Sequence, residues 1–144
     1  MTSMAGELLE VLWGRATTAP VSASQLRVLF ILEHHEGINL RTLADSLAST
    51  PPSTSRLCDR LQAAGFVERV VSPTDRREVR LHISSRGRAF LADLRARREK
   101  ALRVVLDQMP HAHRTALLQG LEAFCDAAAA QIPGDAPGSG SQTA

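Results

Sequence analysis

Residues 50–84 read TPPSTSRLCDRLQAAGFVERVVSPTDRREVRLHIS, and their hydrophobic period changes at Gly65. Before this glycine, side chains suited to a core recur three and four residues apart, which predicts a helix with one buried stripe behind a Thr50 N-cap. The stripe consists of Thr54, Leu57, Cys58 and Leu61. After the glycine, residues 66–71 and 79–83 are rich in β-branched side chains, which predicts the two strands of a hairpin.

Shorter helical patterns precede this stretch. Apolar residues at helical spacing predict a helix over residues 4–13. Ser22, followed three residues later by a glutamine, resembles a capping box that opens a second helix, which Gly37 ends. Asn39 is placed to cap a third helix that runs to about Ala48. Helix, turn, helix and hairpin in this order predict a mainly α fold with a small β-hairpin (α+β), of the winged helix-turn-helix type.

Positive charge is concentrated in the middle of the chain. The net charge of the 144 residues is only +2, yet 13 of the 17 lysines and arginines lie in residues 51–103, with 6 of the 15 acidic residues. Such a block fits a polyanion, because each cation near a phosphate releases condensed counterions. A solvated basic helix face is the alternative that charge alone leaves open.

The helix after Thr50 has a polar face opposite its buried stripe. This face carries Ser53, Ser55, Arg56, Asp59 and Arg60, as expected of a helix that lies in the major groove of DNA. The loop between the strands, SPTDRRE at residues 72–78, is turn-prone and basic. In a winged helix Arg77 could enter the minor groove from this loop, with Asp75 orienting it by charge-assisted hydrogen bonds. A merely solvated turn is the alternative.

The chain resembles the MarR family of bacterial regulators through several short motifs. They are LRTLA at residues 40–44, SRLCDRL at 55–61, GFVER at 65–69, DRR at 75–77, VRLHIS at 79–84, and Gly87. Their order and spacing match the family over about residues 21–90. The resemblance implies a ligand-responsive transcriptional repressor that binds double-stranded DNA at a palindromic operator as a homodimer.

The resemblance also assigns residues to the DNA interface. They are Pro52, Ser53, Ser55, Arg56 and Arg60 on the helix, and Asp75, Arg76, Arg77 and Arg80 in the hairpin. Thr54 departs from the family, which usually carries an aliphatic residue there. Its hydroxyl would either bond the preceding helical turn or point toward DNA.

The flanking segments complete a four-part organisation. It comprises an N-terminal dimerisation helix and connection (1–20), the winged helix-turn-helix (21–88), C-terminal dimerisation helices (89–131) and a disordered tail (132–144). Ser84 or Ser85 can cap the long helix that follows the hairpin, and Pro110 separates it from a last helix over about residues 111–130. These helices carry more apolar side chains than one winged domain can bury, which favours an obligate dimer over a monomeric helical cap.

The family commonly responds to small aromatic or phenolic ligands, or to oxidants. Candidate effector-binding residues are Trp13, Phe30, His34 and His35, although isolated aromatic residues are more often part of a core. Oxidant-sensing members use a cysteine near the first helix, where this sequence has none. Cys58 and Cys125 are expected to be free and buried. His111 and His113 lack metal-ligand spacing, so neither a metal nor a cofactor is predicted.

Other functional classes are less well supported. No nucleophile motif or P-loop is present, so the chain is not expected to be an enzyme. A winged-helix protein-interaction module without specific DNA binding is the competing interpretation. The N-terminus has no signal-peptide pattern and no apolar run could span a membrane, which predicts a cytoplasmic protein.

Overall fold

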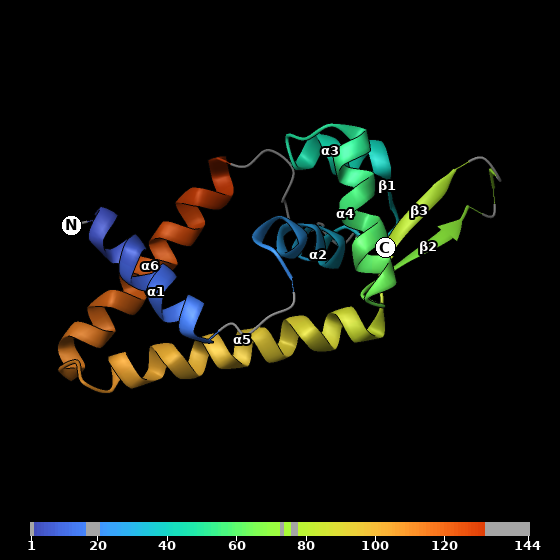
Figure 1. Ribbon diagram of the computed structural model, residues 1–144. Coiled ribbons are helices and arrows are strands. Elements are labelled where there is room, and N and C mark those ends of the chain that lie inside the picture. Colours follow the sequence, from blue (N-terminus) through green and yellow to red (C-terminus); the bar gives the residue numbers. More distant parts are fainter. Residues whose placement is uncertain (1, 17–20, 73, 76–77, 132–144) are drawn as a thin grey trace, which may run out of the picture. The chain divides into compact units, whose positions relative to one another are not determined.

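The computed structural model describes residues 2–16, 21–72, 74–75 and 78–131, in two compact units, Met1–Ala101 and Leu102–Ala144. The helices are α1 Thr2–Ala16, α2 Ala23–His34, α3 Leu40–Ser46, α4 Pro51–Ala63, α5 Ser85–Leu106 and α6 His111–Gln131 (Figure 1). The strands are β1 Ile38–Asn39, β2 Val67–Val71 and β3 Val79–Ile83. The predicted tail and part of the predicted connection, residues 17–20, lie outside the described residues.

Helices α2 and α3 begin at the predicted caps. The Ser22 hydroxyl accepts a hydrogen bond from the backbone N–H of Gln25, whose side chain accepts one from the N–H of Ser22, so the capping box is confirmed. Asn39 caps α3 by accepting from the N–H of Thr42 at 2.8 Å. Helix α3 ends two residues before the predicted Ala48, because Ala48 has φ 49 and the left-handed region cannot continue a right-handed helix.

The predicted hairpin is present, within a larger sheet. Strands β2 and β3 pair antiparallel, and Figure 1 shows them extending away from α2, α3 and α4. The first strand starts at Val67 rather than at Phe66, because the Phe66 N–H closes the end of α4 on the Leu61 carbonyl. Strand β1 was not predicted; it pairs with the other edge of β3 and gives the order β1-β3-β2. Two residues are too few to show an alternating pattern.

One hydrophobic core lies among α2, α3, α4, the sheet and the first half of α5. Its buried members are Val28, Leu29, Leu32, Leu43, Leu47, Cys58, Leu61, Phe66, Val67, Leu81, Ile83, Leu91 and Leu94. The architecture is therefore mainly helical with a small antiparallel sheet, as the sequence predicted. This core fixes the position of α4 relative to the hairpin.

A tight junction joins the end of α4, the hairpin and the start of α5. The Ser84 hydroxyl donates to the Gly65 carbonyl at 2.6 Å and accepts from the Gly87 N–H at 3.0 Å. Gly65 has φ +79, which suits glycine at the end of a helix. Gly87 packs so closely that a Cβ there would lie 2.4 Å from the Phe66 carbonyl oxygen. Serine and glycine at these positions are therefore structural requirements.

Several large apolar side chains are exposed outside this core. They are Met4, Leu8 and Val11 of α1, Val104 and Val105 of α5, and Leu117, Leu118, Leu121 and Phe124 of α6. Among the described side chains of residues 102–129, none is buried. The second unit therefore has apolar surface without a core of its own in the single chain. No described helix is long and apolar enough to cross a membrane.

Candidate nucleic-acid interface

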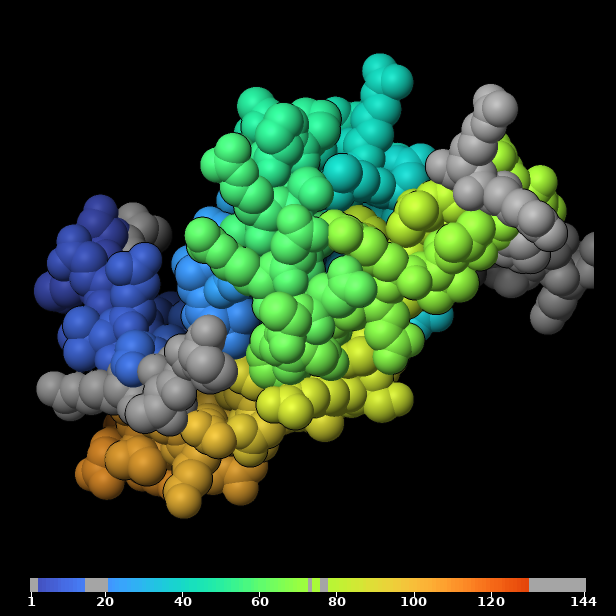
Figure 2. All heavy atoms as spheres, turned by 45° about the vertical axis from the view of Figure 1, so that its right-hand side comes forward, coloured from blue at the N-terminus to red at the C-terminus, as the bar shows by residue number. Residues whose placement is uncertain are grey.

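Helix α4 presents the predicted polar face to solvent. Thr50 caps it: its hydroxyl accepts from the backbone N–H of Ser53 and donates to the Ser53 hydroxyl at 3.1 Å. Pro52, Ser53, Arg56 and Arg60 are exposed, and Ser55 is partly buried. Figure 2 shows α4, in green, beside the yellow-green strands of the hairpin on one face of the molecule. The serines thus lie near the positive N-terminal end of the helix, with the arginines on the following turns.

The opposite stripe of α4 is buried, and Thr54 lies within it. Thr54 is fully buried, and its hydroxyl has no hydrogen-bond partner among the described residues. Both expectations for this side chain are therefore wrong, since it neither bonds the preceding turn nor points toward the exposed face. The rest of the stripe is confirmed, with Cys58 and Leu61 buried and Leu57 partly buried.

The substitution Thr54→Val is expected to raise the free energy of unfolding by about 1 kcal/mol. Valine keeps the shape and the helix propensity of threonine while it removes a buried hydroxyl that no partner satisfies. Urea denaturation of the two proteins measures the difference. The control Thr54→Ser keeps the hydroxyl and loses a buried methyl group, so it should be less stable than the unmodified chain. A loss of stability in Thr54→Val would show that the hydroxyl has a partner.

The two cysteines are free but differ in environment. Cys58 is buried, and burial raises the pKa of its thiol to about 11, against the opposing effect of Arg69. The thiol is therefore protonated and unreactive at neutral pH. Cys125 is exposed, so the expectation that both cysteines are buried is wrong for Cys125. Cys125 lies on α6, in the unit where none of the described side chains of residues 102–129 is buried.

An ion pair connects α4 to the hairpin. The Nη2 of Arg69, on β2, lies 2.6 Å from the Oδ1 of Asp59, on α4. Asp59 was predicted on the polar face and Arg69 in a strand, and neither was assigned a role in the interface. The signal was weak, because nothing in the sequence pairs two charges ten residues apart across different elements.

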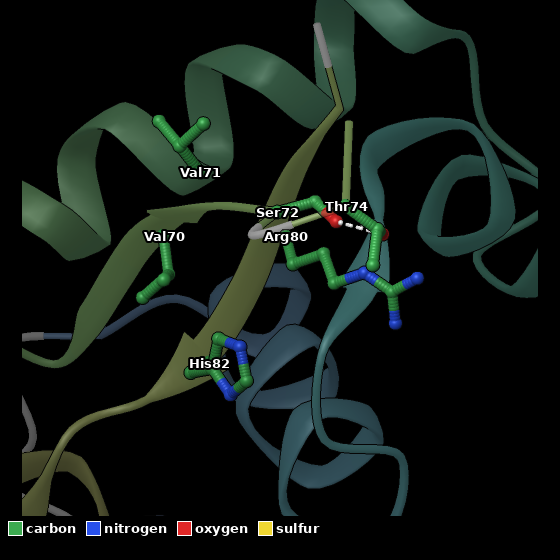
Figure 3. Close-up of a pocket in the computed structure, with 6 residues that line it drawn as sticks. All are labelled: Val70, Val71, Ser72, Thr74, Arg80 and His82. Carbon is green, nitrogen blue, oxygen red and sulfur yellow. Dashed lines mark hydrogen bonds between the residues drawn. The ribbon is translucent and has the colours of Figure 1, made fainter. Parts of the chain in front are cut away.

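Arg80 lies on the face of the sheet opposite to that of Arg69, because it pairs with Val70, the next residue of β2. Its guanidinium is 3.4 Å from both the Glu78 carboxylate and the Gly37 carbonyl oxygen. It borders a hollow of about 370 Å³, which Figure 3 shows from close by. The hollow is lined by Val70, Val71, Ser72, Thr74, Arg80 and His82. The contact of Arg80 with DNA stays a prediction.

The tip of the hairpin is described only in part. Arg76 and Arg77 lie outside the described residues, so the orientation of Arg77 by Asp75 stays a prediction. The described part forms a closed turn: the Ser72 N–H donates to the Glu78 carbonyl at 2.8 Å and the Glu78 N–H to the Asp75 carbonyl at 3.0 Å. The loop therefore leaves and re-enters the sheet at a hydrogen-bonded neck.

The candidate effector residues occupy two kinds of position. Phe30 lies under the guanidinium of Arg95, which also forms a bidentate ion pair with Glu33. This hydrogen-bonded pairing lowers the pKa of Glu33. Trp13 lies under the guanidinium of Arg98, whose Cζ is 4.8 Å from the centre of the indole ring. The structure thus places both aromatic residues against arginines of α5.

The two candidate histidines differ from the aromatic pair. His34 ends α2 and His35 caps it, and both side chains are exposed. Neither histidine lines the hollow beside Arg80. Within the described part of the chain, no cluster of three metal-ligating side chains is found.

Known proteins share this architecture. The MarR family profile matches residues 21–79. An uncharacterized HTH-type transcriptional regulator of Bacillus subtilis, YfiV, is 27% identical over 101 residues, which cover 70% of this chain and 63% of that protein. Another of Mycobacterium bovis, Mb0904, is 36% identical over 86 residues, or 59% of this chain and 60% of that protein. The chain thus matches about three fifths of the length of these relatives.

Solved structures extend the likeness to most of the chain. RV1404 from Mycobacterium tuberculosis superposes with a TM-score of 0.78 at 32% identity, covering 88% of each chain. The transcriptional regulator Tm0710 from Thermotoga maritima has the same fold, with a TM-score of 0.74 at 18% identity over 88% of this chain and 89% of its own. The relatives with a named role are transcriptional regulators and not enzymes, in agreement with the sequence. In fold and in sequence, the chain belongs to the MarR family.

Proposed function

We propose that the protein is a transcriptional regulator that binds DNA sequence-specifically. The observation that carries this proposal is the exposed face of α4, where serines precede two arginines one turn apart, beside the hairpin. A helix of this kind fits the major groove, where arginine binds guanine edges and short hydroxyl side chains reach bases or phosphates. The hairpin would then follow the backbone, with Arg77 in the minor groove.

A homodimer on a palindromic operator is part of the proposal. The exposed apolar side chains of α1, α5 and α6 support it, because burying them against a second copy removes apolar surface from water. Two copies related by a twofold axis would present two α4 helices to half-sites about one helical turn apart. The solved structure of a family relative with DNA, a MepR variant of S. aureus bound to an oligodeoxyribonucleotide, has the same fold at 15% identity.

Response to a small aromatic or phenolic effector, with release of DNA and relief of repression, completes the proposal. Trp13 and Phe30 are the residues that support it, since each offers an aromatic face beside an α5 arginine. An anionic aromatic compound would compete for such arginines and stack on the same rings. The PcaV regulator of Streptomyces coelicolor, which shares the fold, was solved in complex with its natural ligand.

Salt dependence gives a direct test of the DNA-binding function. DNA fragments captured from a genomic library should include a palindromic site, and affinity for it should fall roughly 10³-fold between 50 and 200 mM salt for about six phosphate contacts. Fluorescence anisotropy with a labelled fragment measures this fall. A fragment with a scrambled half-site is the control and should bind more weakly at every salt concentration.

The competing function, protein interaction without DNA, predicts a different result. In that case no fragment would be enriched, and binding to any DNA would be weak and independent of its sequence. Either finding would contradict the proposed function.

A further inference from the structure

The ion pair between Asp59 and Arg69 stands on the proposed DNA-binding side of the protein. Asp59 lies on the exposed face of α4, between Arg56 and Arg60 in the sequence, with 55% of its side chain exposed. A carboxylate there opposes binding of a polyanion, because like charges repel. The presence of Asp59 on a face proposed to bind DNA therefore needs another explanation.

Arg69 reaches this carboxylate from the hairpin. It pairs with Leu81 in the sheet, so its side chain leaves β2 on the face where Leu81 packs into the core. Asp59 holds it at the margin of that core, where 32% of the Arg69 side chain is exposed. Helix α4 packs against β2, and the ion pair thus bridges the two elements that carry the proposed major-groove and minor-groove contacts.

We propose that Arg69 is a further DNA-contacting residue, which binds a backbone phosphate between the two grooves, and that Asp59 is the positioning residue that orients it. This inference rests on the proposed DNA-binding function. The strand of DNA backbone that separates the major from the minor groove passes between a helix in one and a hairpin tip in the other. Arg69 lies at that place in the protein.

The chemistry of the guanidinium supports both contacts at once. Arginine has five N–H donors in a rigid plane, and Nη2 of Arg69 donates the hydrogen bond to Asp59. Another edge of the plane can therefore donate to a phosphate while the carboxylate fixes the orientation. Fixing the side chain before binding reduces the rotamer entropy that is lost on docking. Exposed ion pairs contribute little to stability, so a purely structural role explains the pair poorly.

The substitution Asp59→Asn tests this idea, because the two explanations predict opposite signs. If Asp59 orients Arg69, affinity for the operator fragment should fall roughly tenfold at moderate salt, because each subunit keeps its phosphate contact but loses the orientation that strengthens it. If Asp59 acts only by its charge, removing a negative charge should raise the affinity. Fluorescence anisotropy against the same fragment measures both, and thermal unfolding confirms that the variant is folded.

Glu68→Gln is the matched control. Glu68 is exposed, neighbours Arg69 on β2, and pairs with His82 on the opposite face of the sheet. It loses the same charge without touching the ion pair, so its affinity should be unchanged or slightly higher. Equal behaviour of Asp59→Asn and Glu68→Gln overturns the proposal.

Two further variants separate contact from orientation. Arg69→Ala should weaken binding to all DNA sequences alike and make the dependence on salt less steep by about one phosphate contact per subunit. Arg69→Lys keeps the charge but lacks the planar fork, so several-fold weaker binding is expected, and this variant decides the matter if Asp59→Asn does not fold. Binding of Arg69→Lys at full strength overturns the proposal. Failure of the unmodified protein to bind any DNA overturns the proposed function itself, and this inference with it.

Discussion

Replacing Gly87 by alanine is expected to lower the free energy of unfolding by about 3 kcal/mol. The added Cβ would lie 2.4 Å from the Phe66 carbonyl oxygen and 2.7 Å from Cγ1 of Ile83. The first of these atoms is backbone at the base of the hairpin, so the strain cannot be relieved by a change of rotamer and α5 must move. Urea denaturation followed by circular dichroism measures the loss.

Gly120→Ala provides a control of opposite sign. Gly120 lies inside α6, and nothing is within 4 Å of the position of its Cβ. Alanine is the better helix former by about 1 kcal/mol, so this variant should be more stable where α6 unfolds together with the rest of the chain. If Gly87→Ala were as stable as the unmodified protein, that result would contradict the close packing of α5 against the base of the hairpin.

The double substitution Arg56→Ala and Arg77→Ala is expected to weaken operator binding roughly 1,000-fold or more. Arg56 lies on the exposed face of α4, and Arg77 belongs to the basic loop whose tip lies outside the described residues. Each loses a charged contact to a base edge or groove worth about 1–3 kcal/mol, and a dimer loses each contact twice. Competition binding with the palindromic fragment measures the effect.

A charge-matched variant controls for the loss of two positive charges. Arg97→Ala with Arg114→Ala removes one arginine of α5 and one of α6, which pair with Asp93 and Asp107 and lie outside the proposed DNA interface. Its affinity should change little. If the interface variant kept full affinity for the operator fragment while a protein partner still bound, the function would be protein interaction and not regulation through DNA.

Local signals in the sequence predicted most of the fold. Ser22, Asn39 and Thr50 each cap the expected helix, because a cap depends on residues only two or three positions away. The buried stripe of α4 and the extent of β3 follow from periodicity in the same way. Strand β1 was missed since it exists only through pairing with β3, about 40 residues further along the chain.

The candidate interface was predictable in composition and less so in detail. The exposure of Ser53, Arg56 and Arg60 follows from the helical period, which sets one face of α4 against the core. The contact between Asp59 and Arg69 depends on how α4 packs against β2, which no spacing reveals. The buried hydroxyl of Thr54 was misjudged for a related reason, because the sequence shows that a residue faces inward but not which acceptors it finds there.

The Ser84 hydroxyl has a mechanical consequence. This one hydroxyl donates to the carbonyl of Gly65, just after α4, and accepts from the N–H of Gly87, in the first turn of α5. A rotation of α5 about its start must either carry the end of α4 with it or break one of these bonds. The junction therefore couples the start of α5 to the end of α4, so a ligand or partner that displaces the start of α5 is expected to displace the end of the DNA-facing helix as well.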